Sequence, residues 1–458
     1  MRKIFTEKDT PFIGPTASVG GFFLGPIYYW MAAPFLFIAR YDPVGPAYMV
    51  AIFGVATVFL LFKFLKEIAG FYPAMLAAFL YSTAPLIVRY SRSSWNPNPM
   101  PFFSLLLFYF LYLAISRKNY KLLFVSGLAF GFAIQLHYLS IILVPISGLI
   151  ALICIPPRKW AISAIAAVLG FLVPFSPFLF FEIKNNFPNF RTIIEFVSRD
   201  ANSGFKSLNP YWIFIDIGNI FFEAISKVEK TLYTRAAFII LVFATLSSLV
   251  INLKSVEKRT PLIIAIVWLL GGLAGLRFYT GAVYDYYFGF LFPAPFFLYG
   301  LTLGHFFWDR TYLKTAAIAL TIFLIFVFQK NAYYKTPPNR LILQTSEIAN
   351  LVIEKSEGKE YNFGLISESN SDHAYRYFLE VKHKKPKELE EIVTDQLLVV
   401  CESKVCQPLG HPVWEIAGFG RAEVTGEWFF EKYGIKVFKL EHWPGAPSPA
   451  GKPAIKGA

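Results

Sequence analysis

One short stretch of the chain concentrates side chains that bind oxyanions and hydroxyl groups. It reads Arg89-Tyr90-Ser91-Arg92-Ser93-Ser94-Trp95-Asn96-Pro97-Asn98-Pro99. Guanidinium groups bind phosphate oxygens through paired N–H donors, and asparagine amides donate to and accept from hydroxyl groups. The prolines keep this backbone out of a regular helix. The stretch is therefore either a solvated connector or a site for an anionic, hydroxyl-rich ligand.

Further candidate residues stand at the ends of long apolar runs. His137, Glu182, Lys184, Asp285 and Tyr286 belong to this group. Asp285 is the most informative acid among them, because a carboxylate near a bilayer is costly unless it has a task. Together with the first stretch, these side chains suit a phosphate-linked sugar on a lipid that enters from the bilayer. The predicted substrate-binding residues are Arg89, Arg92, Trp95, Asn96, Asn98, His137, Glu182, Lys184, Asp285 and Tyr286.

Each candidate also has an ordinary structural interpretation. The arginines could bind only lipid headgroups, and Trp95 and Tyr286 are typical interfacial anchors. Asparagine is common in turns for purely local reasons. His137 could cap the end of a span, and Glu182 and Lys184 could pair with one another. The rest of the sequence has to decide between these interpretations.

Composition indicates a helical membrane protein that crosses the bilayer many times. Of 458 residues, 55% are hydrophobic and 16% are charged, whereas soluble domains carry about 25% charged residues. Apolar runs long enough to cross a hydrocarbon core of about 30 Å recur along the first three quarters of the chain. We expect about ten spans. They are predicted near residues 44–62, 71–88, 99–116, 121–137, 139–156, 160–181, 236–253, 260–278, 286–307 and 312–330.

The basic loops predict the orientation of these spans. Every second connection carries Lys and Arg, which places those connections in the cytoplasm. They are Lys63/Lys66, Arg117/Lys118/Lys121, Arg158/Lys159, Lys254/Lys258/Arg259 and Arg310/Lys314. The segments that then lie outside are the Arg89–Pro99 stretch, the turn at 137–140, residues 182–235, residues 277–285 and everything after Lys330. The same sorting accounts for the net charge of +13, so we expect no nucleic-acid partner.

Two regions flank or interrupt the predicted spans of the helical part. Residues 1–43 are interpreted as the remainder of a first external loop, in which 22–39 form an interfacial or re-entrant helix because Gly25-Pro26 and Pro34 interrupt the apolar run. Residues 44–334 form the transmembrane domain. Within it, 182–235 are too long for a plain connector, and we expect an external loop with an interfacial helix near 211–230.

The last quarter of the chain has a different composition and predicts a small extracytoplasmic α/β domain at residues 340–442. Helices are expected near 340–356 and 371–382. Short strands are expected at 361–366, 397–401 and 435–440. The tail at 443–458 is rich in Pro, Gly, Ala and Lys, and we expect it to be disordered. Cys401 and Cys406 could pair in an oxidising compartment, whereas Cys154 is interpreted as inert packing.

No sequence signature for a cofactor is legible. The chain contains no phosphate-binding glycine loop, zinc signature, nucleophile elbow or dinucleotide fingerprint. We therefore identify no cofactor, while a divalent cation stays an open alternative.

The segment from Gly14 to Trp30 resembles a known family. It reads Gly14-Pro15-Thr16-Ala17-Ser18-Val19-Gly20-Gly21-Phe22-Phe23-Leu24-Gly25-Pro26-Ile27-Tyr28-Tyr29-Trp30. This is similar to the first-external-loop signature of membrane glycosyltransferases of the GT-C fold, the relatives of protein O-mannosyltransferases and aminoarabinose transferases in glycosyltransferase family 39. The stretch Ser91–Asn98 resembles the family's next external turn. The resemblance covers roughly residues 11–330.

The resemblance implies a polyprenyl-phosphate sugar donor and an inverting transfer on the outer face of a bacterial or archaeal plasma membrane. In such enzymes an aspartate of the first external loop is the general base, and basic residues hold the donor phosphate. Here the family's first helix and acidic motif do not precede the signature, and Glu7 and Asp9 do not match the catalytic position. The catalytic residue therefore stays unknown. We expect the chain to begin at an internal methionine or to derive from a truncated reading frame.

Two alternatives to an active glycosyltransferase follow from the sequence. A truncated, inactive binding protein of the same fold would have lost the base. A transporter of a lipid-linked saccharide would need polar groups near the bilayer midplane, and charges within the predicted spans are nearly absent. The acceptor, whether protein, lipid or polysaccharide, is not encoded in any motif.

Overall fold

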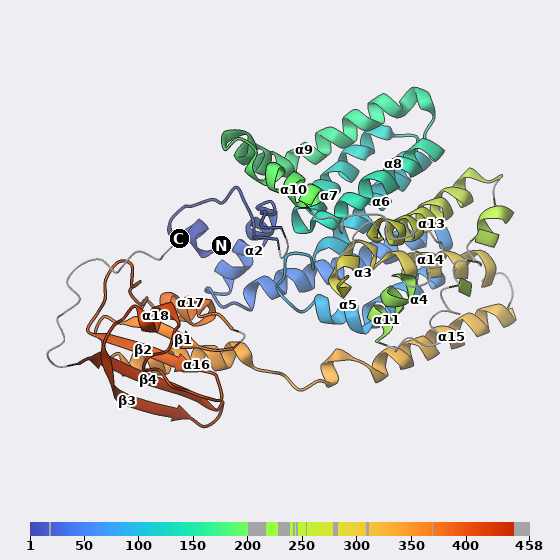
Figure 1. Cartoon of the computed structure of the whole chain (residues 1–458). Coiled ribbons are helices and arrows are strands. Elements are labelled where there is room, and N and C mark those ends of the chain that lie inside the picture. Colours follow the sequence, from blue (N-terminus) through green and yellow to red (C-terminus); the bar gives the residue numbers. More distant parts are fainter. Residues whose placement is uncertain are drawn as a thin grey trace. The chain divides into compact units, whose positions relative to one another are not determined.

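The computed structural model describes residues 1–17, 20–199, 217–227, 239–240, 243, 246–252, 254–277, 283–307, 311–368 and 370–443. The chain divides into two compact units, Met1–Thr336 and Pro337–Ala458. The first is helical and the second contains a sheet (Figure 1). This confirms the predicted fold class of a helical membrane protein with a small α/β region at its C-terminal end.

The helical unit is a succession of apolar helices joined by short turns. Its α-helices are α1 (Arg2–Thr6), α2 (Ile27–Ile38), α3 (Gly45–Ala69), α4 (Phe71–Thr83), α5 (Pro85–Tyr90), α6 (Met100–Ser116), α7 (Leu123–Leu136), α8 (Leu143–Cys154), α9 (Trp160–Lys184), α10 (Pro188–Arg199), α11 (Ile217–Ser226), α13 (Val256–Leu276), α14 (Ala294–Thr302) and α15 (Thr311–Lys330). Shorter helical turns are η1 (Tyr120–Leu122), η2 (Tyr138–Ile142), η3 (Pro157–Lys159), η5 (Asp285–Leu291), η6 (Leu303–Phe307) and η7 (Tyr333–Lys335).

The described helices follow the predicted apolar runs. Within the described residues, four helices are long and apolar enough to cross a membrane. They are Gly45–Ala69, Pro157–Lys184, Glu257–Leu276 and Thr311–Lys335. A bent pair, Asp285–Leu291 with Ala294–His305, meets at 47°. Other apolar runs form shorter helices, among them Ile27–Ile38, Met100–Ser116, Tyr120–Leu136 and Tyr138–Cys154.

Two residues with extended backbone separate neighbouring helices. Ala84 is extended ahead of Pro85 and separates α4 from α5, as expected for a residue that precedes proline. His137 is extended between α7 and η2. Two further predictions fall partly outside the described residues: the apolar run at 236–253 and the interfacial helix near 211–230. Within the second range, the described residues form α11.

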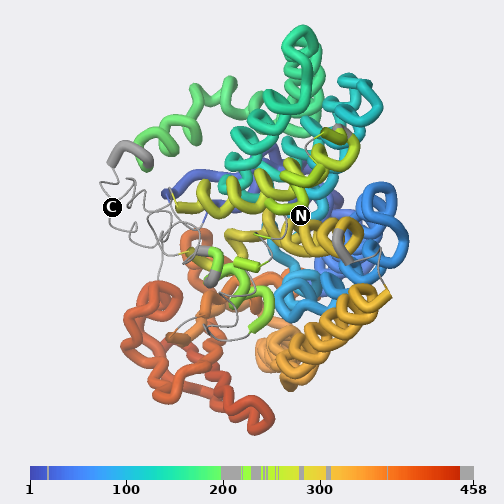
Figure 2. Tube along the Cα trace, turned by 90° about the vertical axis from the view of Figure 1, so that its right-hand side faces the viewer, coloured from blue at the N-terminus to red at the C-terminus, as the bar shows by residue number. Residues whose placement is uncertain are grey.

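Small residues allow a close contact between α7 and α9. A Cβ atom added at Gly127 would lie 1.9 Å from the Ala167 carbonyl oxygen, and one added at Gly170 would lie 1.8 Å from that of Phe124. The backbones of the two helices therefore touch, as small residues permit in membrane helix packing. The helices run side by side in both views (Figures 1 and 2).

The second unit is a four-stranded sheet with helices on both faces. The strand order is β1-β2-β4-β3. β1 (Asn362–Ile366) and β2 (Gln396–Cys401) are parallel, and β4 (Ile435–His442) is antiparallel to both β2 and β3 (Ala422–Phe430). The helices are α16 (Leu341–Lys355), α17 (His373–Val381) and the short α18 (Trp414–Ala417).

Side-chain alternation in β2 builds two separate cores in this unit. Leu398 and Val400 pack with α16 and α17, whereas Leu397 and Val399 pack with Ile416 of α18 on the other face. Both β1 and β2 are buried along their whole length, which is why they read as continuous apolar runs. The strands and helices predicted here are confirmed, except that β3 was missed.

β3 escapes prediction because it is an edge strand with mixed composition. Its residues are mostly exposed or half-buried, and its pairing with β4 is irregular between Val424 and Gly426. Such an irregularity interrupts the period of two by which strands are recognised. Residues 444–458, the part of the predicted disordered tail that follows Trp443, lie outside the described residues.

Candidate functional site

The Arg89–Pro99 stretch connects two helices at one end of the helical unit. Pro85 begins α5 at a position that needs no backbone donor, and α5 ends at Tyr90 after two turns. Pro97 and Pro99 then precede α6, which begins at Met100. The chain between these helices is too short and too rich in proline to form a helix of its own. It therefore presents its polar side chains at a fixed place between α5 and α6.

Asp285 is the centre of the polar group at this end. Its Oδ1 accepts a 2.5 Å hydrogen bond from the Tyr90 hydroxyl. Its Oδ2 lies 3.8 Å from Arg89 Nη1 and 3.8 Å from Lys227 Nζ. The Asp285 side chain is 27% exposed, whereas those of Arg89 and Lys227 are 47% and 40% exposed. We call these four residues the Asp285 cluster.

Lys227 is placed by the end of α11. Its N–H donates to the Glu223 carbonyl at 2.8 Å, and its φ is 55°. This left-handed conformation is a common way to end a helix. The Lys227 carbonyl accepts from Asn331 Nδ2 at 3.3 Å, which ties this helix end to the residues that follow α15. The ammonium group thereby comes to Asp285 from a different element than Arg89.

A series of aromatic rings continues from the cluster. The Trp95 ring lies 4.4 Å from that of Tyr286, and Tyr286 stacks on Tyr284 at 5.8 Å. His137 lies 5.7 Å from Tyr286 and 5.2 Å from Tyr287. Trp95 and Tyr284 are exposed, so this series presents ring faces beside the charged groups. We call these five residues the aromatic wall.

His137 caps η2 at the end of the aromatic wall. Its backbone is extended between α7 and η2, and its Nδ1 accepts from the Leu139 N–H at 3.3 Å. This contact is the one expected from the capping interpretation of His137.

The other predicted residues of the stretch mainly hold its shape. Asn96 Nδ2 donates to the Leu136 carbonyl at 2.6 Å and fixes the stretch to the end of α7. Asn98 Nδ2 donates to the Ser93 carbonyl at 2.6 Å within the stretch itself. The Arg92 guanidinium lies 5.8 Å from the Tyr333 ring centre and is exposed. Arg92 therefore adds an exposed positive charge to the stretch.

Glu182 and Lys184 take no part in the Asp285 cluster. Glu182 is 4% exposed, and it accepts from Asn189 Nδ2 at 2.7 Å and from the Phe190 N–H at 3.1 Å. Asn189 Oδ1 in turn accepts from the Phe23 N–H at 2.8 Å. Glu182 thus joins the start of α10 to the N-terminal segment, while the Lys184 side chain is exposed.

The N-terminal segment contacts the Arg89–Pro99 stretch directly. The Tyr28 hydroxyl and Ser94 Oγ are 2.7 Å apart. The segment folds back on itself through an antiparallel bridge between Thr16 and Phe23, and the Tyr138 hydroxyl donates to the Phe23 carbonyl. The two sequence motifs that carried the family resemblance are therefore neighbours in space. Glu7 takes no part in these contacts, because its side chain is exposed and pairs with Lys3.

The site offers groups for an anion but no ready cage for a metal. No group of three or more His, Cys, Asp or Glu side chains able to hold a metal ion occurs among the described residues. In the Asp285 cluster, two cations face one carboxylate, so the cluster keeps a net positive charge. Side chains of these types can bind an oxyanion beside aromatic faces and hydroxyl groups.

Sequence reasoning missed Lys227 and Tyr90 as members of this cluster. Tyr90 stands beside Arg89, and a phenol next to an arginine was a readable signal for a hydrogen-bonded group. Lys227 follows the apolar residues of α11 and carried no comparable signal. The place of Lys227 in the cluster depends on its contact with Asp285, 58 positions away in the chain. No local sequence pattern encodes such a contact.

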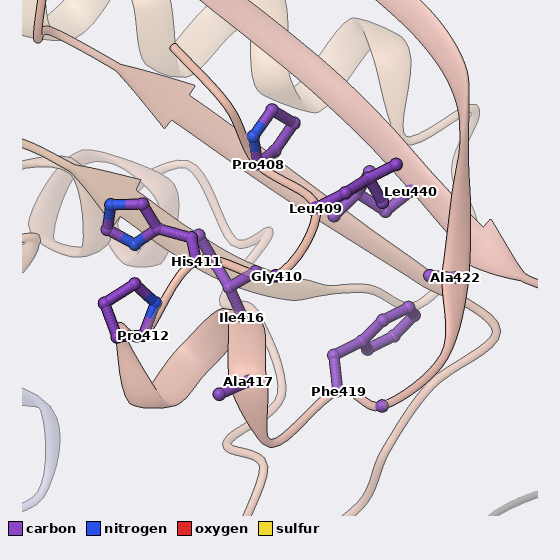
Figure 3. A pocket seen from close by; sticks show the side chains of 11 residues that line it. Pro408, Leu409, Gly410, His411, Pro412, Ile416, Ala417, Phe419, Ala422 and Leu440 are labelled. Atoms are coloured by element: carbon purple, nitrogen blue, oxygen red, sulfur yellow. The ribbon is translucent and has the colours of Figure 1, made fainter. Parts of the chain in front are cut away.

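The second unit contains a separate hollow of different character. A cavity of about 190 Å³ is lined by the loop at 408–412, by Ile416 and Phe419, and by Leu440 of β4 (Figure 3). His411 provides the one imidazole among the lining residues. The His411 Nδ1 accepts from the Val413 N–H at 3.3 Å. No lining residue carries a carboxylate, ammonium or guanidinium group. This hollow therefore has no formal charge to neutralise a phosphate.

Comparisons with known proteins bear on the family and the fold of this chain. The sequence profile of the family "Dolichyl-phosphate-mannose-protein mannosyltransferase" matches residues 24–181, whereas no curated protein matches the chain significantly. A similar solved structure is ArnT from Cupriavidus metallidurans bound to undecaprenyl phosphate. It is 11% identical with a TM-score of 0.58, and the alignment covers 96% of this chain and 91% of that chain.

Two further structures are similar to the chain. The apo state of the same ArnT has a TM-score of 0.55 at 11% identity, again over 96% of this chain and 91% of that chain. The oligosaccharyltransferase of Archaeoglobus fulgidus, in complex with zinc and sulfate, has a TM-score of 0.48 at 15% identity, over 84% of this chain and 56% of that chain. The profile match is confined to residues 24–181, and the likeness to the two ArnT structures shows that this chain has the GT-C fold.

Proposed function

We propose that the protein transfers a sugar from a polyprenyl-phosphate-linked donor to an acceptor on the extracytoplasmic face of the membrane. The observation that carries this proposal is the convergence of Arg89 and Lys227 on one point at the end of a helical membrane unit. A solved structure of the same fold was obtained with undecaprenyl phosphate. The chemistry of the Asp285 cluster fits the phosphate of such a lipid.

The cluster can neutralise charge that develops on the leaving phosphate. When the bond from sugar to phosphate breaks, negative charge grows on the phosphate oxygens. Donors that are already in place at that position lower the barrier. Arginine has five N–H donors and lysine has three, and both side chains are partly exposed here. Each therefore retains donors that a bound phosphate can use.

The aromatic wall gives the same ligand a second surface. Trp95 and Tyr284 expose ring faces beside the cations. Rings of this kind pack on the apolar face of a sugar or on the isoprene units next to the phosphate. A lipid that enters from the bilayer would thus meet apolar rings and cations within one site.

The disulfide of the second unit supports an extracytoplasmic location for that unit. Cys401 and Cys406 are joined, and disulfides persist in oxidising compartments rather than in the cytoplasm. The second unit follows α15 without another apolar helix among the described residues. It therefore belongs on the side to which the end of α15 leads.

A transfer assay tests the proposal. The full chain is reconstituted in proteoliposomes with a membrane extract as acceptor source, and a panel of radiolabelled polyprenyl-phosphate sugars is supplied. We expect label to pass from one donor to an acceptor fraction. Arg89→Ala and Lys227→Ala should each lower transfer by tenfold or more, because each removes one of the two cations that neutralise the phosphate.

Lys118→Ala is the matched control for this assay. Lys118 is exposed just after α6, at the opposite end of that helix from the Arg89–Pro99 stretch, and we expect its variant to transfer normally. Absence of transfer from every donor in the panel would contradict the proposal. Equal activity of the Arg89, Lys227 and Lys118 variants would remove the Asp285 cluster from it.

A further inference from the structure

We propose that Asp285 is a positioning residue that holds Arg89 and Lys227 together as a preformed pair for the donor phosphate. This inference rests on the proposed function and assigns Asp285 a role that differs from contact with the substrate. It explains why a carboxylate stands at the centre of a site for an anion, where by charge alone it would oppose binding.

The two cations need a partner to stay close together. Arg89 lies at the end of α5 and Lys227 directly after α11, so no shared element fixes their separation. Like charges repel, and both side chains are long, flexible and partly exposed. Both lie 3.8 Å from the same oxygen, Asp285 Oδ2. Without that oxygen, each would gain hydration and rotamer freedom by turning away from the other.

The carboxylate itself is anchored from its other side. Asp285 Oδ1 accepts the Tyr90 hydroxyl hydrogen bond. The Tyr90 side chain is buried, and its ring stacks on Phe292 at 6.0 Å. Asp285 also begins η5, whose other end is buried. The phenol and the backbone therefore hold the carboxylate from two directions. Asp285 stays in place and does not move aside when a phosphate binds.

The cations keep capacity for a second oxyanion. Charge-assisted N–H···O bonds are about 2.7–2.9 Å long, and both cation–carboxylate distances are 3.8 Å. The carboxylate therefore orients the two groups without using all of their donors. A phosphate can approach from the exposed side while Asp285 remains in place.

Removal of the Asp285 charge should change anion binding in the direction opposite to that expected from charge alone. Removing one negative charge beside an anion site should tighten anion binding if charge alone decides. If Asp285 positions the cations, the same change should weaken binding, because the pair separates before the phosphate arrives. Asp285→Asn distinguishes these cases, since the side chain keeps its size and its hydrogen bond to Tyr90.

Binding of undecaprenyl phosphate to the full chain in nanodiscs tests this prediction, with uncharged undecaprenol as the reference lipid. We expect Asp285→Asn to weaken binding of the phosphate lipid at least fivefold without changing binding of undecaprenol. Asp285→Glu, which keeps the carboxylate, should recover part of the loss. Tyr90→Phe should weaken binding in the same direction, because it releases the anchor.

Asp395→Asn provides a control with the same change of net charge. Asp395 is exposed in the second unit, outside the Asp285 cluster, and its variant should bind as the wild type does. Thermal unfolding of each variant shows whether the helical unit is intact. Unchanged or tighter binding of the phosphate lipid by a folded Asp285→Asn variant would overturn the inference. Wild-type protein that fails to prefer undecaprenyl phosphate over undecaprenol would instead contradict the proposed function.

Discussion

At the scale of single residues, the structure separates polar groups that meet at a partly exposed point from polar groups that are buried within the fold. Arg89, Lys227 and Asp285 meet at a partly exposed point. Glu182, by contrast, is buried, and all of its described side-chain contacts are hydrogen bonds within the protein. Both kinds of residue look alike in the sequence, because each is a charge at the end of an apolar run.

Glu182→Gln should lower stability and leave lipid binding unchanged. The substitution removes a buried charge that accepts two hydrogen bonds, and it turns an amide donor toward a backbone or side-chain donor. We expect a cost of about 1–3 kcal/mol in stability, seen as a lower apparent melting temperature in nanodiscs. Affinity for undecaprenyl phosphate should stay within twofold of the wild type.

Glu7→Gln is the matched control for this substitution. Glu7 is exposed and pairs with Lys3 across one helical turn, and such a surface pair contributes little. Its variant should melt as the wild type does. A large loss of lipid affinity in a folded Glu182→Gln protein would return Glu182 to the substrate-binding residues.

At the scale of elements, close contacts between helix backbones fix the frame on which the site is built. α7 ends at the turn that carries His137, and Asn96 donates to the last residue of α7. α9 continues to Glu182 and then to α10. The contact between α7 and α9 therefore fixes the positions of the two helix ends that hold the aromatic wall and the N-terminal segment.

Gly170→Ala should disturb this frame. The added methyl group would lie 1.8 Å from the Phe124 carbonyl oxygen, so one backbone has to move. We expect a loss of about 1–3 kcal/mol, measured as reduced yield of monodisperse protein and a lower apparent melting temperature.

Gly148→Ala offers the comparison within the same unit. A Cβ atom at Gly148 meets no atom within 4 Å, and alanine favours the helical conformation over glycine. This variant should be as stable as the wild type or slightly more stable. Equal behaviour of the two alanine variants would show that the contact between α7 and α9 is looser than described.

At the scale of the whole molecule, the chain combines a helical membrane unit with an α/β unit that contains a disulfide. The sheet unit has its own two cores on the faces of β1 and β2. It therefore does not depend on the helical unit for a hydrophobic interior. The proposed extracytoplasmic location applies to this unit as a whole.

Thiol labelling in intact cells tests that location. In a Cys154→Ser background, we expect a membrane-impermeant maleimide to label Cys401 and Cys406 only after treatment with an impermeant phosphine reductant. The expectation follows from a disulfide that is oxidised and that faces the outside of the cell. Labelling before reduction would contradict the disulfide. Labelling that appears only after the cells are permeabilised would contradict the extracytoplasmic location.

The sequence by itself determined the positions of the apolar helices and much of the sheet unit. Runs of apolar residues have to form helices in a bilayer, because no water is present to satisfy their backbone groups. The buried strands β1 and β2 were legible for a related reason, since strands covered on both faces carry continuous apolar residues. The neighbourhood of the Gly14–Trp30 segment and the Arg89–Pro99 stretch followed from a family resemblance, and Tyr28 and Ser94 now provide the contact between them.

Only the tertiary structure decided which charged residues meet. Tyr90 and Asp285 are 195 positions apart, and Lys227 reaches the same carboxylate from the end of a third element. Hydrophobic periodicity records which face of a helix is buried but not which helix lies against it. The tertiary fold therefore assigned Lys227 to the site and Glu182 to the frame, because their partners are distant in sequence and no local pattern specifies them.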